Sequence, residues 1–258
     1  MALKFYWRCE SGTFAAQDYS AGDSTPSTSN QTYGTAGAKI GTNGLIAAVS
    51  VAGAATFDAG TIIANSSDVD TSVGAAGYWW KCETAWPPNG LVHGFRLYHT
   101  LTSKGLRVQS VTGSKLRFRA TDNVTSVDAA PTATLSVGTW YFVIVRWDIP
   151  NDKIKMELYT DGGGGTLTPV TNGSAEITSG VNAIISAANL GGSTWTSVQW
   201  NVHDASYGDR SFSDNAMYCD TYTAKVESNA FITDYVNYSE GSPPTVDPTM
   251  GRCVYILP

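Results

Sequence analysis

The stretch Gly138–Gly165 constrains the fold more than any other part of this 258-residue chain. It contains an eight-residue run, Trp140–Trp147, in which aromatic and β-branched side chains dominate and Arg146 is the single charge. Such side chains fit a pleated strand better than a helix. The run therefore predicts a central strand that is buried on nearly both of its faces.

A second strand follows after a polar turn. Residues Ile149–Asp152 supply a proline and two turn-forming side chains, and Ile154, Met156 and Leu158 then alternate with polar residues. A period of two is typical of a half-exposed strand. We expect a long antiparallel hairpin that breaks at Asp161, because four glycines follow it.

The same stretch carries a resemblance to a known family. It has a Gly-Thr-Trp-Tyr opening, an apolar strand, a polar turn, a strand that ends in Leu-Tyr, and an Asp-Gly turn. This order resembles the central hairpin of laminin-G-like domains, which belong to the concanavalin A-like lectin/glucanase superfamily. Tyr78–Lys81 occupies the place of a Phe-Trp-Val-Lys strand in that family. The resemblance implies an all-β antiparallel jelly-roll sandwich.

Short strand patterns also fill the rest of the chain. Leu3–Cys9 and Cys253–Leu257 are both strand-like, so we expect the N- and C-terminal strands to pair, as they do in the resembled family. No internal linker or repeat appears, which predicts one domain over residues 1–258. Other expected strands are Gly77–Glu83, Gly94–Leu101, Gly105–Val111, Lys115–Ala120, Asn182–Leu190 and Asn215–Val226, with polar segments at Asn65–Gly77 and Asp122–Thr134 and the longest loop at Gly191–Asp214.

The charge balance excludes some classes of partner. The net charge is -6, with 16 Lys and Arg residues, so no broad basic field is available for nucleic acid. No apolar run is long enough for a membrane span, and the N-terminal residues lack a signal-peptide pattern. We therefore expect no nucleic acid and no membrane partner. We expect synthesis in a host cytoplasm, with release in an assembled particle or by a non-classical extracellular route.

The four cysteines lie far apart and form no Cys-x-x-Cys pair. This spacing argues against a zinc site and against a disulfide scaffold. Buried thiols are the expectation for most of them. Cys9 and Cys253 are the pair whose bonding stays open, because both lie in the expected terminal strands.

Catalytic motifs are missing from the sequence. Glycoside hydrolysis needs two carboxylates, and the resembled glucanases carry them as Glu-x-Asp-x-x-Glu on one strand, a motif absent here. Glu157 stands alone and is expected to be an exposed strand charge. His93 and His99 would lie roughly 20 Å apart on an extended strand, too far to share a metal. We expect no enzyme and no catalytic residue.

Calcium binding is a second chemistry that the family resemblance raises. Some laminin-G-like and lectin domains hold calcium at the sandwich rim through carboxylates and backbone oxygens. None of the loop aspartates follows an EF-hand pattern, and such residues are more often turn formers. We therefore expect no cofactor, with calcium left open and any metal site unknown. The available aspartates are Asp58, Asp68, Asp70, Asp122 and Asp161.

The richest candidate for sugar recognition is the loop Thr194–Asp214. Sugars bind to flat apolar rings flanked by amides and carboxylates, and this loop interleaves both kinds of side chain. The alternative is that its aromatic residues pack on the sandwich or contact another subunit. The candidate residues are Trp195, Gln199, Trp200, Asn201, Tyr207, Asp209 and Arg210, with Trp86 in a smaller cluster.

Three functions follow from these observations. The leading hypothesis is a non-enzymatic structural or adhesion protein on a particle surface, as a phage virion decoration, fibre or capsid-associated protein, with glycan binding as an added property. Its partners would be other virion subunits, further copies of itself, or surface glycans. The alternatives are a free carbohydrate-binding lectin module and, more weakly, a glucanase-like hydrolase.

Overall fold

The structure is a computed structural model of the chain. It describes the backbone of residues 2–7, 19–20, 31–35, 39, 44–47, 55–58, 73–82, 92–98, 104–163, 166–185, 197–203, 210–219, 231–233, 235–236, 245–246 and 252–254. Side chains are described for residues 35, 39, 73–82, 95–97, 104–162 and 167–185.

The larger sheet is built around β11 (Trp140–Asp148). Its neighbours are β6 (Val73–Cys82) and β12 (Lys153–Gly163), both antiparallel, so the predicted hairpin is confirmed. The sheet order is β13-β12-β11-β6-β15-β1-β2, and β4 also pairs with β15 and with β3. The other members are β13 (Thr166–Ile177), β15 (Arg210–Cys219), β1 (Ala2–Trp7), β2 (Tyr19–Ser20), β3 (Gln31–Gly34) and β4 (Gly44–Ala47).

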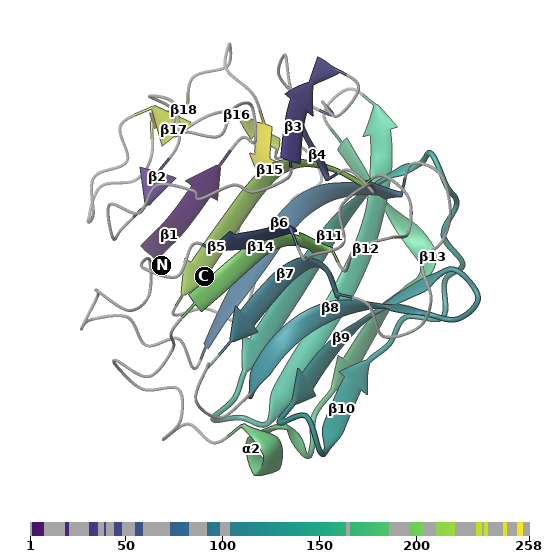
Figure 1. Ribbon diagram of the computed structural model, residues 1–258, viewed down its shortest axis with the longest axis vertical. Helices are drawn as coiled ribbons and strands as arrows, with labels where there is room; N and C mark the ends of the chain where they lie inside the picture. The colour runs from purple at the N-terminus through teal and green to yellow at the C-terminus, as the bar shows by residue number, and fades with distance from the viewer. Residues whose placement is uncertain are drawn as a thin grey trace.

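The second sheet contains six described strands, and Figure 1 shows it layered over the first. Its order is β10-β9-β8-β7-β14-β5. Strands β7, β8 and β9 pair in succession, as the alternating pattern predicts, and a tight turn at residues 112–114 joins β8 to β9. The members are β10 (Ser126–Ala129), β9 (Lys115–Thr121), β8 (Gly105–Val111), β7 (Val92–Tyr98), β14 (Ser197–His203) and β5 (Ala55–Asp58).

The apolar core lies between the two sheets. Trp147 of β11 stacks on Phe95 of β7 with ring centroids 5.5 Å apart, and Phe95 also contacts Phe118 of β9. All three side chains are essentially inaccessible to water. Burying one such ring stabilises the folded state by about 1.5–3 kcal/mol. The fold is thus an all-β antiparallel sandwich of the jelly-roll kind, as the sequence predicts.

The outer face of the larger sheet is buried as well. Phe142 and Ile144 are 3% and 1% exposed there, although they point away from the core. Trp79 meets Phe142 edge to face at 5.2 Å, and the ammonium of Lys39 lies 5.1 Å from the Trp79 ring. Lys39 also pairs with Asp161. The prediction that β11 is buried on both faces is therefore confirmed.

The described chain ends do not pair with each other, which corrects the expected terminal pairing. Strand β1 lies between β15 and β2. The C-terminal strand β19 (Arg252–Val254) instead pairs with β16 (Phe231–Thr233). Because β1 has a partner along each edge, a terminal strand has no place beside it at those positions. A further short pair joins β17 (Tyr235–Val236) and β18 (Thr245–Val246).

Five other expectations change. Strand β13 follows the glycines, where the hairpin was expected to break, and β6 begins at Val73, inside the expected polar segment Asn65–Gly77. The polar stretch Asp122–Thr134 contains β10. The expected loop Gly191–Asp214 contains β14 and the start of β15. The expected strand Asn182–Leu190 begins as a short helix, α2 (Val181–Ile184).

The turn between β11 and β12 anchors this helix. The Asp152 carboxylate accepts hydrogen bonds from the backbone N–H groups of Asn182 (2.7 Å) and Gly180 (2.8 Å). These bonds lower the pKa of Asp152, with the bond from Asn182 as the largest cause, and desolvation opposes them. A carboxylate at a helix start satisfies N–H groups that lack an intrahelical partner. Asp152 therefore links the central hairpin to α2, which Figure 1 shows beside β9 and β10.

We expect Asp152→Asn to lower the free energy of unfolding by about 0.5 kcal/mol at pH 7, because a neutral amide oxygen replaces the charged acceptor of these N–H groups. Asn tolerates the positive φ of 62° at this position, so the substitution tests the charge. Because the folded pKa is lowered, this stability is present above the unfolded pKa of about 4 and is lost as pH falls through the folded value.

Urea unfolding at pH 7 and at about pH 2 measures this difference. The two proteins should differ at pH 7 and converge in acid. Asn182→Ala is the matched control, since Asn182 donates through its backbone and should retain the acid dependence. A difference that persists unchanged in acid would contradict the role given to the Asp152 charge.

Candidate functional site

The outer face of the six-stranded sheet carries a row of polar residues, one from each strand. In antiparallel sheets, residues directly opposite each other point to the same face. The register pairs Asp128 with Arg119, Arg119 with Arg107, Arg107 with Arg96, Arg96 with Gln199, and Gln199 with Asp58. We call this set the cross-sheet row. The alternating residues Leu106, Phe118 and Ala120 are buried in the core, so the described side chains of the row, those of Arg96, Arg107, Arg119 and Asp128, face outward.

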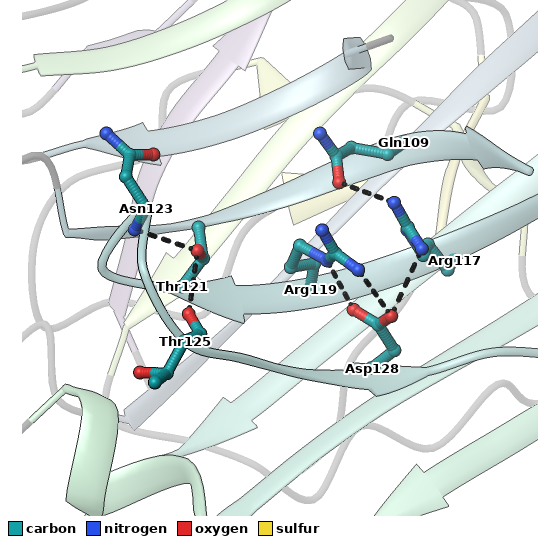
Figure 2. A network of polar contacts seen from close by, with 7 residues as sticks. All are labelled: Gln109, Arg117, Arg119, Thr121, Asn123, Thr125 and Asp128. Carbon is teal, nitrogen blue, oxygen red and sulfur yellow. Dashed lines mark hydrogen bonds and ion pairs between the residues drawn. The ribbon is translucent and has the colours of Figure 1, made fainter. Parts of the chain in front are cut away.

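Asp128 organises one end of the row (Figure 2). Its two carboxylate oxygens accept hydrogen bonds from Arg119 Nε at 2.6 Å and Nη2 at 2.7 Å, which is a bidentate pair. Arg117 Nη1 donates to the same carboxylate at 3.2 Å, and Arg117 Nη2 donates to Gln109 Oε1 at 3.3 Å. One carboxylate and one amide thus fix two guanidinium planes.

These side chains are only partly exposed to water, although they lie on an outward face of the sheet. The side chain of Arg117 is 12% exposed, that of Arg119 21% and that of Asp128 25%, while Gln109 is buried. Desolvation lowers the pKa of Arg117; the Asp128 charge opposes this shift, and the Arg119 charge adds to it. The ion pairs are therefore stronger than fully solvated surface pairs, because water screens them less.

A rigid turn closes the β9–β10 hairpin beside this network. The Asp122 carboxylate accepts hydrogen bonds from the N–H groups of Val124 and Thr125 and from the Thr125 hydroxyl. Thr121 Oγ1 accepts from the N–H of Asn123 and donates to the Thr125 carbonyl, as Figure 2 shows. The hydrogen bonds that the Asp122 carboxylate accepts lower its pKa, and the bond from the backbone N–H of Thr125 is the largest cause. Asp122 is thus a turn former, as predicted.

The structure describes only some of the predicted sugar-binding residues. Gln199, Trp200 and Asn201 lie on strand β14, and Arg210 begins β15. The register pairs Gln199 with Arg96 in the cross-sheet row and Trp200 with Phe95. The loop expected here is therefore a strand, and the glycan-binding role of its residues stays a prediction. Trp86, Trp195, Tyr207 and Asp209 lie outside the described residues.

Sequence analysis missed the cross-sheet row because its members come from distant segments. The signal that could have found it is the outward position of Arg96, Arg107 and Arg119, each of which alternates with apolar neighbours. Pairing them required the register between strands, which spacing along the chain does not supply. The register also places His203 opposite His93. The sequence alone had suggested a distance only for His93 and His99, which lie on one segment.

Glu157 differs from its expected environment. Its side chain is 14% exposed and not solvated, because it pairs with Arg146 of β11 and with Lys155, whose Nζ lies 3.2 Å away. Arg146 is a diagonal neighbour in the register, which brings the two charges together on the outer face of the larger sheet. Burial raises the pKa of the adjacent Tyr159 to about 12, and the Glu157 charge adds to this shift. Glu157 is committed to ion pairs.

The remaining candidates are the aspartates that were considered as calcium ligands, and the structure describes two of them. Asp161 pairs with Lys39, and Asp58 lies in β5, while Asp68 and Asp70 lie outside the described residues. Within the described ranges, no group of three or more potential ligands could hold a metal ion. No helix among the described residues is long and apolar enough to span a membrane.

Cys82 is buried and forms no disulfide, as expected for most of the cysteines. Cys253 lies on β19 and Cys219 on β15, whereas Cys9 is outside the described residues. The bonding of Cys9 with Cys253 thus stays open.

Comparison with solved structures supports the class of fold. The chain is 12% identical to a Trypanosoma rangeli sialidase in complex with the inhibitor DANA, with a TM-score of 0.51, and the match covers 84% of this chain and 30% of the sialidase. At this identity the likeness shows the fold alone. No family model matches the sequence, and no curated protein sequence matches it either.

Two further structures show weaker likeness. The cellulose-induced protein Cip1 is 16% identical, with a TM-score of 0.47, over 77% of this chain and 89% of its own. Domain 4 of AbnA, a GH43 extracellular arabinanase from Geobacillus stearothermophilus, in complex with arabinotriose, is 12% identical with a TM-score of 0.47, over 84% and 93%. The structural neighbours thus include carbohydrate-binding sandwich domains, some of them from enzymes.

We expect Asp128→Asn to lower the free energy of unfolding by about 1–2 kcal/mol, because it leaves two shielded guanidinium groups without their shared carboxylate. Thermal or urea unfolding at low and high salt measures the effect, which should shrink as salt screens the remaining repulsion. Ser126→Ala is the control, since Ser126 is exposed on the same strand and face. Equal stability of the two variants would contradict an organising role for Asp128.

Proposed function

We propose that the protein is a non-catalytic carbohydrate-binding module and that the cross-sheet row is its binding face. The observation that carries the proposal is the network in which Asp128 and Gln109 hold Arg117 and Arg119 in fixed orientations on an outward sheet face. Guanidinium, carboxylate and amide groups form paired hydrogen bonds, which is how adjacent sugar hydroxyls are recognised.

Preorganisation favours such a role. A binding side chain that is already held in one rotamer loses little conformational entropy when a ligand arrives, whereas a mobile arginine would lose about 0.5–1.5 kcal/mol. The strands that carry the row are fixed by the core beneath them, where Leu106, Phe118 and Ala120 are buried. A site on rigid strands is therefore more precise than a site on the connecting loops.

The finer family assignment belongs to the same proposal. The central hairpin resembles that of laminin-G-like domains, and the observed sandwich has the all-β jelly-roll fold that the resemblance implies. We propose a laminin-G-like module on that basis. The absence of catalysis is proposed from the missing carboxylate motif and from the commitment of Glu157 to Arg146 and Lys155.

A glycan array followed by calorimetry on the full chain tests this function. We expect the wild-type protein to bind at least one glycan class and Arg119→Met to weaken that binding at least tenfold. Glu176→Gln, an exposed substitution on the other sheet, should leave it unchanged. No binding at millimolar sugar would refute the module.

Two other outcomes would redirect the proposal. Binding that survives Arg119→Met but is lost in Trp195→Ala or Trp200→Ala would move the site to the residues that the sequence singled out. Sustained release of reducing ends from a β-glucan, abolished by Glu157→Gln, would favour the glucanase alternative.

We also propose that the module is displayed on the surface of a particle, a phage virion, with other virion subunits or copies of itself as partners. This part rests on the sequence, whose 15% of charged residues leaves a surface built mainly from hydroxyl and amide groups. Sedimentation of particles from the native source should bring the protein down with them, and it should stay with them in high salt. A wholly monomeric pool would contradict particle display and favour a free lectin.

A further inference from the structure

We propose that the outer face of the larger sheet carries a binding seat for a primary alkylammonium group, which the chain fills with its own Lys39 and which an external amine can enter in its place. The seat consists of the Trp79 ring and the Asp161 carboxylate. Lys39 Nζ lies 5.1 Å from the centroid of the Trp79 ring and donates a hydrogen bond to Asp161 Oδ2. The seat and the cross-sheet row lie on different sheets, so the occupant of the seat is independent of saccharide binding.

The two parts of the seat belong to the sheet, whereas the ammonium group comes from outside it. Trp79 lies on β6 and Asp161 on β12, and the central strand β11 runs between these two strands. Lys39 belongs to none of the described strands and is 122 residues from Asp161 along the chain. Strand pairing therefore positions the ring and the carboxylate, and Lys39 is a ligand that the chain itself supplies.

The Trp79 ring is held in one orientation by its neighbours. Phe142, its cross-strand partner on β11, meets it edge to face at a centroid distance of 5.2 Å. Gly77 leaves room for Phe142, since a Cβ atom at Gly77 would lie 2.9 Å from Phe142 Cζ. A ring that is already fixed attracts a cation without a further loss of conformational entropy. The seat is therefore preorganised.

A second pair of the same kind lies on this face. Lys81 Nζ lies 4.9 Å from the centroid of the Trp140 ring. These two residues are direct cross-strand partners, and Lys81 follows Trp79 by two positions on β6, so both pairs point to one side of the sheet. The backbone of Lys81 is fixed within the sheet, whereas Lys39 reaches the face from outside. Lys39 is therefore the ammonium group that an external ligand can replace.

The depth of the ion pair allows this exchange. The side chain of Lys39 is 19% exposed and that of Asp161 37%, whereas Trp79 is buried. Water screens an ion pair at this depth, so the pair holds Lys39 only weakly. An external amine can enter at the exposed carboxylate and take over both contacts. A primary ammonium group suits the seat because it donates N–H bonds to Asp161 while it faces the ring, whereas a quaternary group has no N–H to donate.

Chemical rescue of the full-length Lys39→Ala protein tests the proposal. This substitution empties the seat, so n-butylammonium should raise the midpoint of thermal unfolding in a dose-dependent manner. Neutral n-butanol should not raise it, and neither should sodium chloride at the same ionic strength. Adding Asp161→Asn should weaken the apparent affinity for n-butylammonium about tenfold, because a charge-assisted hydrogen bond is lost. The wild type should bind the amine more weakly than Lys39→Ala does, since the amine has to displace Lys39.

Two further measurements keep the proposal open to refutation. Lys115→Ala removes a lysine from the other sheet, and n-butylammonium should leave its unfolding midpoint unchanged. Should Lys39→Ala fail to fold, the indole N–H resonance of Trp79 in the wild type should shift when n-butylammonium is added. Equal rescue by n-butanol would indicate that an apolar gap is filled and would overturn the ammonium specificity. A folded Lys39→Ala protein that does not respond, an equal response of Lys115→Ala, or an unchanged Trp79 resonance would overturn the seat.

A lysine-containing peptide distinguishes the two sources of such a ligand. A capped tripeptide with lysine between two glycines presents the same ammonium group on a peptide backbone. Rescue of Lys39→Ala by this peptide at least as strong as rescue by n-butylammonium would support a lysine side chain of a partner protein as the ligand. Rescue by n-butylammonium alone would support a free amine.

Discussion

Burial of β11 on both faces is the constraint on which the arrangement of the other strands depends. One face carries Val143, Val145 and Trp147, which belong to the core between the sheets. The opposite face carries Phe142 and Ile144, which are also buried. A strand of this kind must be covered from two sides, so it lies inside a sheet and needs both a facing sheet and an outer cover. The six-stranded sheet supplies the first, and Lys39 contributes to the second through Trp79 and Asp161.

The central hairpin and the strands β7, β8 and β9 could be predicted because their patterns are local. Aromatic and β-branched residues mark β11, and period-two alternation marks β8, β9 and β12, where buried and partly exposed residues alternate along much of each strand. By contrast, β13 is interrupted by Pro169, Asn172 and Gly173, three residue types that are depleted in strands, so its sequence gives no continuous strand pattern. It forms because it pairs along the edge of β12, which is a tertiary effect.

The candidate site could be predicted only in part for the same reason. The sequence correctly treats Asp122 as a turn former, but Asp128, Arg119 and Arg107 are separated along the chain and meet through strand pairing alone. Glu157 shows the opposite error. A lone glutamate in a strand is usually solvated, yet register and the cover on that face enclose it beside Arg146. Composition describes what a surface is made of, whereas register decides which groups meet on it.

The register that aligns the guanidinium groups of β8 and β9 is also the one that buries Leu106 and Phe118. A slip of one residue would turn every arginine of these strands inward and every apolar side chain outward. Such a slipped sheet would lose its buried core together with its charged face. A stable fold in which the strands are out of register and the row is lost therefore cannot exist. The concentration of intact charged faces is therefore the same quantity as the concentration of correctly folded protein.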